Sequence, residues 1–75
     1  METELKIGGI YRNWKTKNLY KVHGIVKHSE TLEPMVYYEA LYDNPESKFW
    51  VRPLSMFTDM KEKDGKKVPR FTFVE

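Results

Sequence analysis

Apolar and polar residues alternate along five segments of the chain, and this period of two is typical of strands that bury one face. The pattern predicts strands over residues 8–14, 19–28, 35–42, 49–52 and 68–74. The alternation is clearest in the second segment, where the residues expected on one face are Tyr20, Val22, Gly24, Val26 and His28. The glycine at the centre of this segment predicts a bulge or a bend.

Short polar segments separate the strands and predict turns at residues 15–18, 29–34, 43–47 and 63–66. After the fourth strand, Pro53 suits an early helical position, and Met56, Phe57 and Met60 have the spacing of residues that share one face of a helical turn. This order predicts a mainly β fold, a small five-stranded SH3-like barrel with a short helical turn before the last strand. An OB-fold ranks second because it needs a longer chain and a helix between the third and fourth strands.

The length of 75 residues allows one domain, so residues 1–75 are expected to form a single SH3-like β-barrel. The absence of cysteine excludes disulfides, zinc–thiolate sites and cysteine nucleophiles, so the core must be apolar and dense. The first residues are charged, and no segment approaches the length of a membrane span. We therefore expect a soluble, cytoplasmic protein with no membrane partner.

The formal net charge is +2, which is a weak basic bias. Two stretches are densely basic, residues 12–17 and residues 61–67, and Glu62 and Asp64 dilute the second. A nucleic-acid-binding protein usually gathers its Lys and Arg side chains on one face. The total number of basic residues does not show whether they cluster in this way. Each stretch is therefore interpreted first as a solvated turn.

The densest polar segment is residues 28–33, where the second strand gives way to a loop. Its hydroxyls and carboxylates could satisfy free backbone N–H groups in a turn, which is a structural role. Alternatively, His28 lies at the rim of a pocket, and Glu30 or Glu33 fixes its tautomer. Both interpretations remain open, and Thr31 belongs to either arrangement.

Neither a metal site nor a catalytic centre is predicted. His23 and His28 are an odd number of positions apart, so an unbroken strand sends them to opposite faces, although a bulge at Gly24 would reverse this. Ser29 is poorly placed to react with the neighbouring His28, because neighbours on an extended chain point apart. We expect no enzyme activity and no cofactor.

Trp50 and Arg52 lie two positions apart and therefore share a strand face. A guanidinium suits bidentate capture of a phosphate or carboxylate, and an indole offers a stacking platform. The alternative is that Arg52 stacks on a core tryptophan and pairs with Glu39 or Glu33. Arg70 could join either arrangement. Most other large rings are expected in the core, namely Tyr11, Trp14, Tyr20, Tyr37 and Tyr42.

Several spaced motifs resemble those of one family, domain of unknown function family 1653. They are His28-Ser29-Glu30-Thr31-x-Glu33, Trp50-Val51-Arg52-Pro53 and Val68-Pro69-Arg70-Phe71, with Gly9-x-Tyr11, Tyr37 and Met56-Phe57 between and around them. The resemblance implies a small SH3-like barrel found mainly in bacteria and their viruses, with no established activity. It also implies that the polar members of these motifs belong to the family pattern. The family usually has a histidine and an aromatic residue near positions 13 and 14, where this chain has Asn13 and Trp14.

These observations favour a non-catalytic binding module that holds a small anionic, nucleotide-like ligand at the mouth of the barrel. The residues expected at that mouth are His28, Glu30, Thr31, Glu33, Tyr37, Trp50, Arg52 and Arg70. In a phage, such a module would sequester its ligand. The alternatives are an RNA- or DNA-binding barrel that uses the Lys-rich turns, and a protein-interaction adaptor, as a monomer or a small homo-oligomer.

Overall fold

The computed structural model describes residues 5–75, which form seven strands and one helical turn. The elements are β1 (Ile10–Asn13), β2 (Leu19–Lys27), β3 (Pro34–Ala40), β4 (Phe49–Pro53), α1 (Leu54–Phe57), β5 (Met60–Lys63), β6 (Lys66–Pro69) and β7 (Phe71–Phe73). The first four strands and the helical turn lie where the sequence predicts them. Across residues 5–75, no helix has the length and apolar character that a membrane crossing requires.

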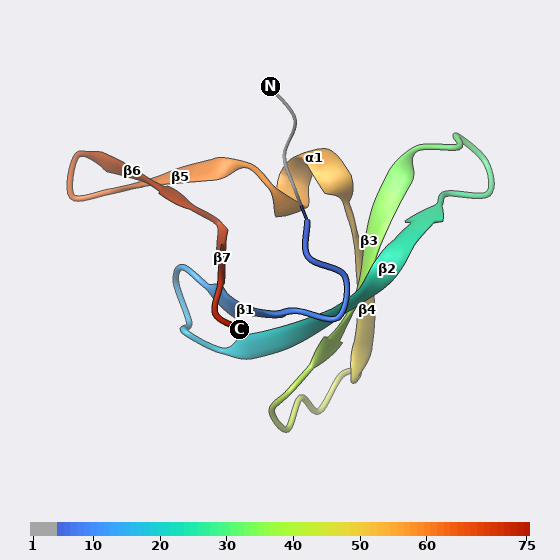
Figure 1. Cartoon of the computed structure of the whole chain (residues 1–75), viewed down its shortest axis with the longest axis horizontal. Helices are drawn as coiled ribbons and strands as arrows, with labels where there is room; N and C mark the ends of the chain where they lie inside the picture. The colour runs from blue at the N-terminus through green and yellow to red at the C-terminus, as the bar shows by residue number, and fades with distance from the viewer. Residues whose placement is uncertain (1–4) are drawn as a thin grey trace.

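Five strands form one antiparallel sheet in the order β4-β3-β2-β1-β7 (Figure 1). The last strand crosses over to pair with the first, in the register Tyr11↔Phe73 to Asn13↔Phe71. The two edge strands of the described sheet, β4 and β7, form no ladder with each other. The fold is therefore mainly β with an open sheet, and the closed five-stranded barrel expected from the sequence is not confirmed.

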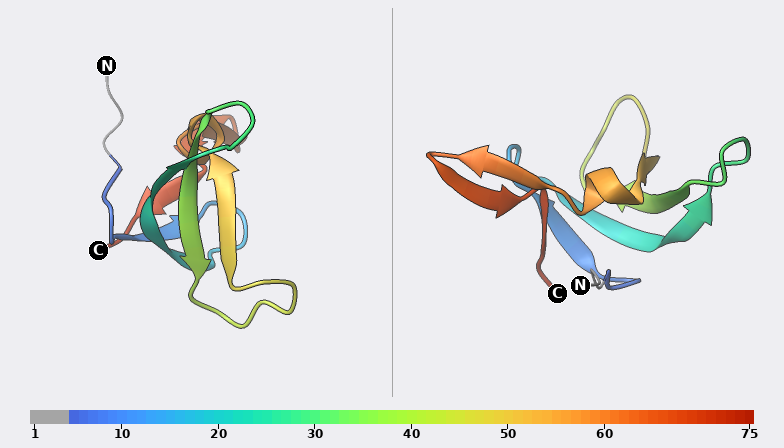
Figure 2. Two further views of the ribbon diagram at one scale, coloured as in Figure 1. Left: turned by 90° about the vertical axis from the view of Figure 1, so that its right-hand side faces the viewer. Right: turned by 90° about the horizontal axis from the view of Figure 1, so that it is seen from above.

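The strand predicted over residues 68–74 is interrupted at Arg70, and its first half pairs elsewhere. β5 and β6 form a separate hairpin that projects from the sheet (Figures 1 and 2). Its two-residue turn holds Asp64 at φ 53° and Gly65 at φ 77°, and residues of this type adopt the left-handed conformation at least cost. At the interruption, the Arg70 N–H donates to the Asp59 carbonyl, which turns the chain from β6 into β7.

A bulge in β2 changes which side chains are buried. The register with β3 shifts between Val22 and Gly24, so His23 is the extra residue. Beyond the bulge, Ile25 lies opposite the buried Val36, and Val26 lies on the other face. The bulge predicted at the glycine is confirmed, but the grouping of Val26 with Val22 on one face is wrong because the extra residue reverses the alternation.

The core lies between the inner face of the sheet, defined by Val22, Val36 and Tyr38, and the helical turn α1. Phe57 is 1% exposed and stacks on Phe71, with ring centroids 4.1 Å apart and ring planes 6° apart. Tyr11 and Tyr38 meet the Phe57 ring edge-on, at centroid distances of 5.6 and 5.4 Å. Aromatic rings thus supply the buried area that a short chain needs.

Candidate functional site

The eight residues expected at one mouth come from four parts of the fold, although Arg70 and Arg52 both lie close enough to Asp59 to lower its pKa. Residues 28–33 form the tip of the β2–β3 hairpin, Tyr37 lies on the outer face of the sheet, and Arg70 lies at the β6–β7 junction. Trp50 and Arg52 stay together on the inner face, as predicted, because they are cross-strand partners of the buried Tyr38 and Val36.

The loop at residues 28–33 is closed by its own hydrogen bonds. The His28 Nδ1 atom accepts the N–H groups of Glu30, at 3.1 Å, and Thr31, at 3.3 Å. The Thr31 hydroxyl accepts the Glu33 N–H at 3.2 Å, and the Glu33 carbonyl accepts the His28 N–H at 2.9 Å. An Nδ1 atom that accepts leaves the ring proton on Nε2. Backbone N–H groups therefore fix this tautomer, and the geometry matches the structural interpretation of the segment.

Tyr37 lies in an aromatic cluster on the outer face, with His23 at a centroid distance of 5.5 Å and Phe49 at 6.0 Å. The His23 Nε2 atom lies 2.7 Å from a Glu39 carboxylate oxygen, and the other oxygen accepts from Lys48 at 3.2 Å. Hydrogen bonds from His23 and then Lys48 lower the pKa of Glu39. This cluster and the Trp50 side chain lie on opposite faces of the sheet, so they cannot share one ligand.

Arg70 is fully engaged by a carboxylate. Its Nε and Nη2 atoms donate to the two Asp59 oxygens at 2.7 and 2.9 Å, a bidentate pair. Hydrogen bonds from Arg70 lower the pKa of Asp59, and hydrogen bonding to Asp59 raises the pKa of Arg70. The pair ties the β6–β7 junction to the segment after α1, which is a structural role.

Trp50 and Arg52 line a cavity of about 220 Å³ on the inner face. Its complete lining is Tyr20, Tyr38, Tyr42, Asn44, Trp50 and Arg52, which we call the Arg52 cavity. The Trp50 indole N–H donates to the Ser47 carbonyl at 3.1 Å, which fixes the orientation of the ring. The sequence pattern predicts Tyr20 and Tyr42 in the core and Asn44 in a turn, and nothing in that pattern indicates that they gather around Arg52.

A hydrogen-bonded chain of polar groups forms one wall of the Arg52 cavity. The Tyr20 and Tyr42 hydroxyls are 2.9 Å apart, and Asn44 Nδ2 donates to the Tyr42 hydroxyl at 3.0 Å. Burial, followed by the hydrogen bond with Tyr42, raises the pKa of Tyr20. Its hydroxyl therefore stays protonated at neutral pH and keeps its ability to donate.

Among residues 5–75, no carboxylate oxygen lies within 4 Å of the Arg52 guanidinium, although its charge adds to the hydrogen bonds from Arg70 in lowering the pKa of the nearby Asp59. Its Nε atom donates to the Tyr38 hydroxyl at 3.3 Å, and its central carbon lies 5.7 Å from the centroid of the Phe71 ring. The alternative pairing with Glu39 does not form, because Glu39 lies on the outer face with His23. A pairing with Glu33 does not form either, since no ion pair of Arg52 occurs in the described chain. Its terminal amino groups therefore remain available to an anion.

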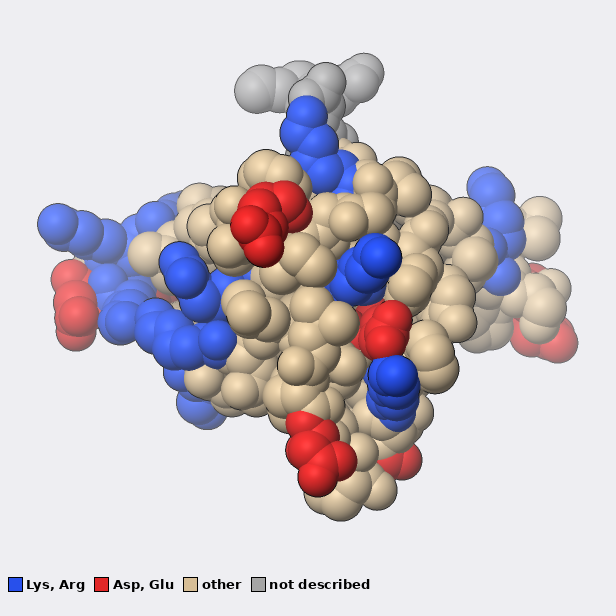
Figure 3. All heavy atoms as spheres, turned by 60° about the horizontal axis from the view of Figure 1, so that its bottom comes forward, with Lys and Arg blue, Asp and Glu red and all other residues tan. Residues whose placement is uncertain are grey.

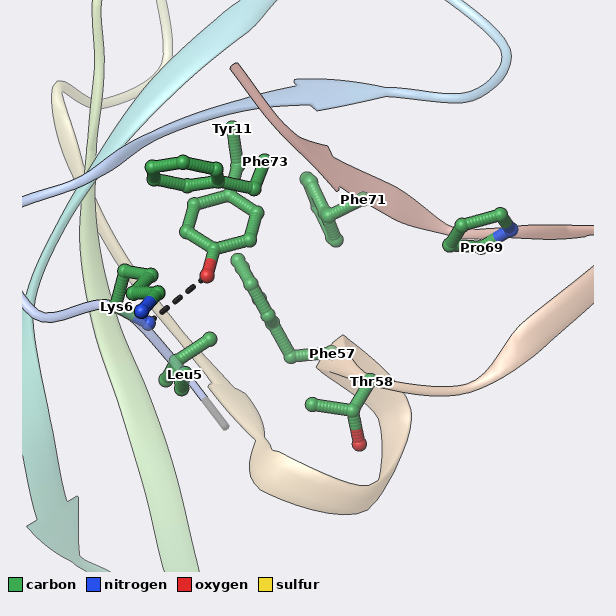
Figure 4. Close-up of a pocket in the computed structure, with 8 residues that line it drawn as sticks. All are labelled: Leu5, Lys6, Tyr11, Phe57, Thr58, Pro69, Phe71 and Phe73. Atoms are coloured by element: carbon green, nitrogen blue, oxygen red, sulfur yellow. Dashed lines mark hydrogen bonds between the residues drawn. The ribbon is translucent and has the colours of Figure 1, made fainter. Parts of the chain in front are cut away.

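Another cavity, of about 240 Å³, is mostly apolar (Figure 4). The rings of Tyr11, Phe57, Phe71 and Phe73 point toward one another along it, and the Lys6 N–H donates to the Tyr11 hydroxyl at 2.9 Å. It offers no cluster of functional groups. Within residues 5–75, no group of three or more His, Cys, Asp or Glu side chains is placed to hold a metal ion.

Comparison with known proteins places this geometry in a family. The crystal structure of a DUF1653 protein from Bordetella bronchiseptica is similar, with a TM-score of 0.83 and 28% sequence identity over 92% of this chain and 87% of that chain. No curated protein matches the chain. Residues 9–73 match the family described as "Protein of unknown function (DUF1653)". The match spans most of the chain, and the protein therefore belongs to the DUF1653 family.

Proposed function

We propose that this protein is a non-catalytic binding module that captures a small, planar, nucleotide-like anion in the Arg52 cavity. The observation that carries the proposal is the half-buried Arg52 side chain, which lines a cavity and has no carboxylate within ion-pair distance in the described chain. A buried or half-buried cation without a counter-ion favours the binding of an anion.

The other groups around Arg52 suit a ligand with a flat, polar ring. Trp50 is held in place by its bond to Ser47 and offers a rigid surface for stacking. The hydroxyls of Tyr20 and Tyr42 and the Asn44 amide supply both donors and acceptors. The volume of about 220 Å³ suits a nucleobase or a pentose phosphate better than a dinucleotide.

The antiparallel strand order and the helical turn after β4 support classing the module with SH3-like barrels. A nucleotide-like ligand and a chain without cysteine both fit a cytoplasmic protein. If the protein is phage-encoded, tight binding without turnover would sequester the ligand.

The test is a thermal-shift screen of nucleotides, cyclic nucleotides and sugar phosphates, because a ligand that binds only the folded state raises the melting temperature. Compounds that do so are then titrated into Trp14→Phe, in which Trp50 is the only remaining tryptophan. A ligand that stacks in the Arg52 cavity should quench the fluorescence of Trp50.

Arg52→Gln should weaken binding by about 10- to 150-fold, because hydrogen bonds to charged groups contribute about 1.5–3 kcal/mol. Lys27→Gln is the control, since it removes the same charge from an exposed position at the end of β2, outside the Arg52 cavity. The proposal fails if no compound raises the melting temperature, or if the two variants lose affinity equally.

A further inference from the structure

The two basic stretches of the sequence, residues 12–17 and 61–67, lie side by side in the folded protein. Arg12, Trp14, Lys17 and Lys63 line a single cavity of about 200 Å³ between the β1–β2 turn and the β5–β6 hairpin. We call it the basic cleft. In Figure 3 the Lys and Arg side chains gather on the left of the molecule, on the side where the hairpin projects.

Local structure brings these segments together. The Asn13 side chain accepts the N–H groups of Lys15, at 2.9 Å, and Thr16, at 3.1 Å, and so builds the β1–β2 turn. The Trp14 N–H then donates to the Arg70 carbonyl at 2.8 Å, which joins the turn to the end of β6. The Lys17 Nζ atom donates to the Trp14 backbone carbonyl at 3.2 Å, so this cation is held against the turn that carries Trp14.

The charges in the basic cleft repel one another and have no carboxylate partner in the described chain. Repulsion from Lys63, with a smaller contribution from Arg12, lowers the pKa of Lys17. Lys63 also lies directly opposite Lys66 in the hairpin, a cross-strand pair of like charges. Glu62 and Asp64 are on the same hairpin, yet neither carboxylate comes within 4 Å of a cation among residues 5–75.

We propose that the basic cleft binds single-stranded nucleic acid, with phosphates on Arg12, Lys17 and Lys63 and one base stacked on Trp14. A polyanion relieves the repulsion between several cations at once. The Trp14 indole in the lining of the cleft accommodates a base, and a ligand made only of phosphate, or a membrane surface, would leave the indole unused. This site uses other residues than the Arg52 cavity, so it does not depend on the function proposed above.

The test measures the fluorescence anisotropy of a labelled oligothymidylate of about twelve nucleotides, a length within the usual site size. When the logarithm of the binding constant is plotted against the logarithm of the salt concentration, three phosphate contacts on a single strand give a slope of about −2. The affinity should therefore fall about 20-fold between roughly 50 and 200 mM salt. In Trp50→Phe, where Trp14 is the only tryptophan, the oligonucleotide should quench the fluorescence.

Lys17→Gln combined with Lys63→Gln should reduce the slope to about −0.7, as expected for one remaining contact. Lys27→Gln combined with Lys48→Gln removes the same charge from exposed positions outside the cleft and should leave the slope near −2. Circular dichroism of both double variants checks that they are folded.

The proposal is overturned if the protein does not bind the oligonucleotide, or if the two double variants lose the same amount of affinity for it. So does binding to phosphatidylserine vesicles without binding to the oligonucleotide, which would assign the cleft to a membrane surface. If Arg52→Gln abolishes oligonucleotide binding and the cleft variant retains it, the nucleic acid binds in the Arg52 cavity instead. If Arg52→Gln retains oligonucleotide binding and the cleft variant loses it, the basic cleft is the nucleic-acid site, whatever the outcome of the small-ligand screen.

Discussion

Replacing Phe57 by alanine should remove about half or more of the stability of the domain. The ring is 1% exposed, stacks on Phe71 and receives the edges of Tyr11 and Tyr38. Phe→Ala changes in cores cost about 3–5 kcal/mol, and the loss of three ring contacts places this one near the upper limit. A 75-residue domain has a total stability of about 4–11 kcal/mol. A loss of about 5 kcal/mol therefore removes between about half and all of this stability.

Phe57→Leu keeps the domain folded enough to measure. It retains apolar volume but loses the aromatic contacts, so we expect a loss of about 2 kcal/mol. With a slope near 1 kcal/mol/M for a chain of this size, the urea midpoint should fall by about 2 M. Unfolding is followed by far-ultraviolet circular dichroism and tryptophan fluorescence.

Met56→Ala is the control, because Met56 belongs to the same helical turn but is 44% exposed. It should change stability by less than about 0.5 kcal/mol. A Phe57→Leu midpoint equal to that of Met56→Ala would refute the reasoning that Phe57 holds α1 against the sheet.

Three further predictions concern other parts of the fold. Asp59→Asn should destabilise the protein at neutral pH by about 1 kcal/mol, after allowance for solvent screening. Because Arg70 lowers the folded-state pKa of Asp59 below its ordinary value of 3.8, the contribution is present above that pH and is lost as the pH falls through the folded-state pKa. Urea midpoints of both proteins should therefore converge in acid. Gly9→Ala should cost about 1–3 kcal/mol, since a Cβ there would lie 2.8 Å from the Phe73 ring, whereas Gly24→Ala meets no atom within 4 Å and should change the melting temperature little. His28→Ala should speed hydrogen exchange at the Glu30 and Thr31 amides without changing ligand affinity at the Arg52 cavity, and a loss of affinity there would count against a purely structural role for this loop.

The sequence by itself determined the first four strands and the local geometry of several sites. The alternation of apolar and polar residues located β1 to β4. The proline at position 53 and the spacing that follows it located the helical turn, but the expected shared face is wrong, because Met60 begins β5 and Met56 is exposed whereas Phe57 is buried. The glycine in β2 indicated the bulge, and the two-position spacing of Trp50 and Arg52 placed them on one face. These features depend on neighbours in the chain, so the pattern is sufficient to predict them.

Only the tertiary structure decided which distant residues meet. The extra residue at the bulge reversed the faces of β2, and the separate pairing of β6 with β5 divided the expected last strand. The expected common mouth was dispersed, because the hairpin loop satisfies its own backbone, Tyr37 faces outward and Asp59 engages Arg70. The same pairings placed Tyr20, Tyr42 and Asn44 around Arg52 and joined two basic stretches into one cleft. The reason is physical: a short-range pattern fixes the direction of each side chain relative to its strand, whereas its partners depend on register and crossover, which involve the whole sheet.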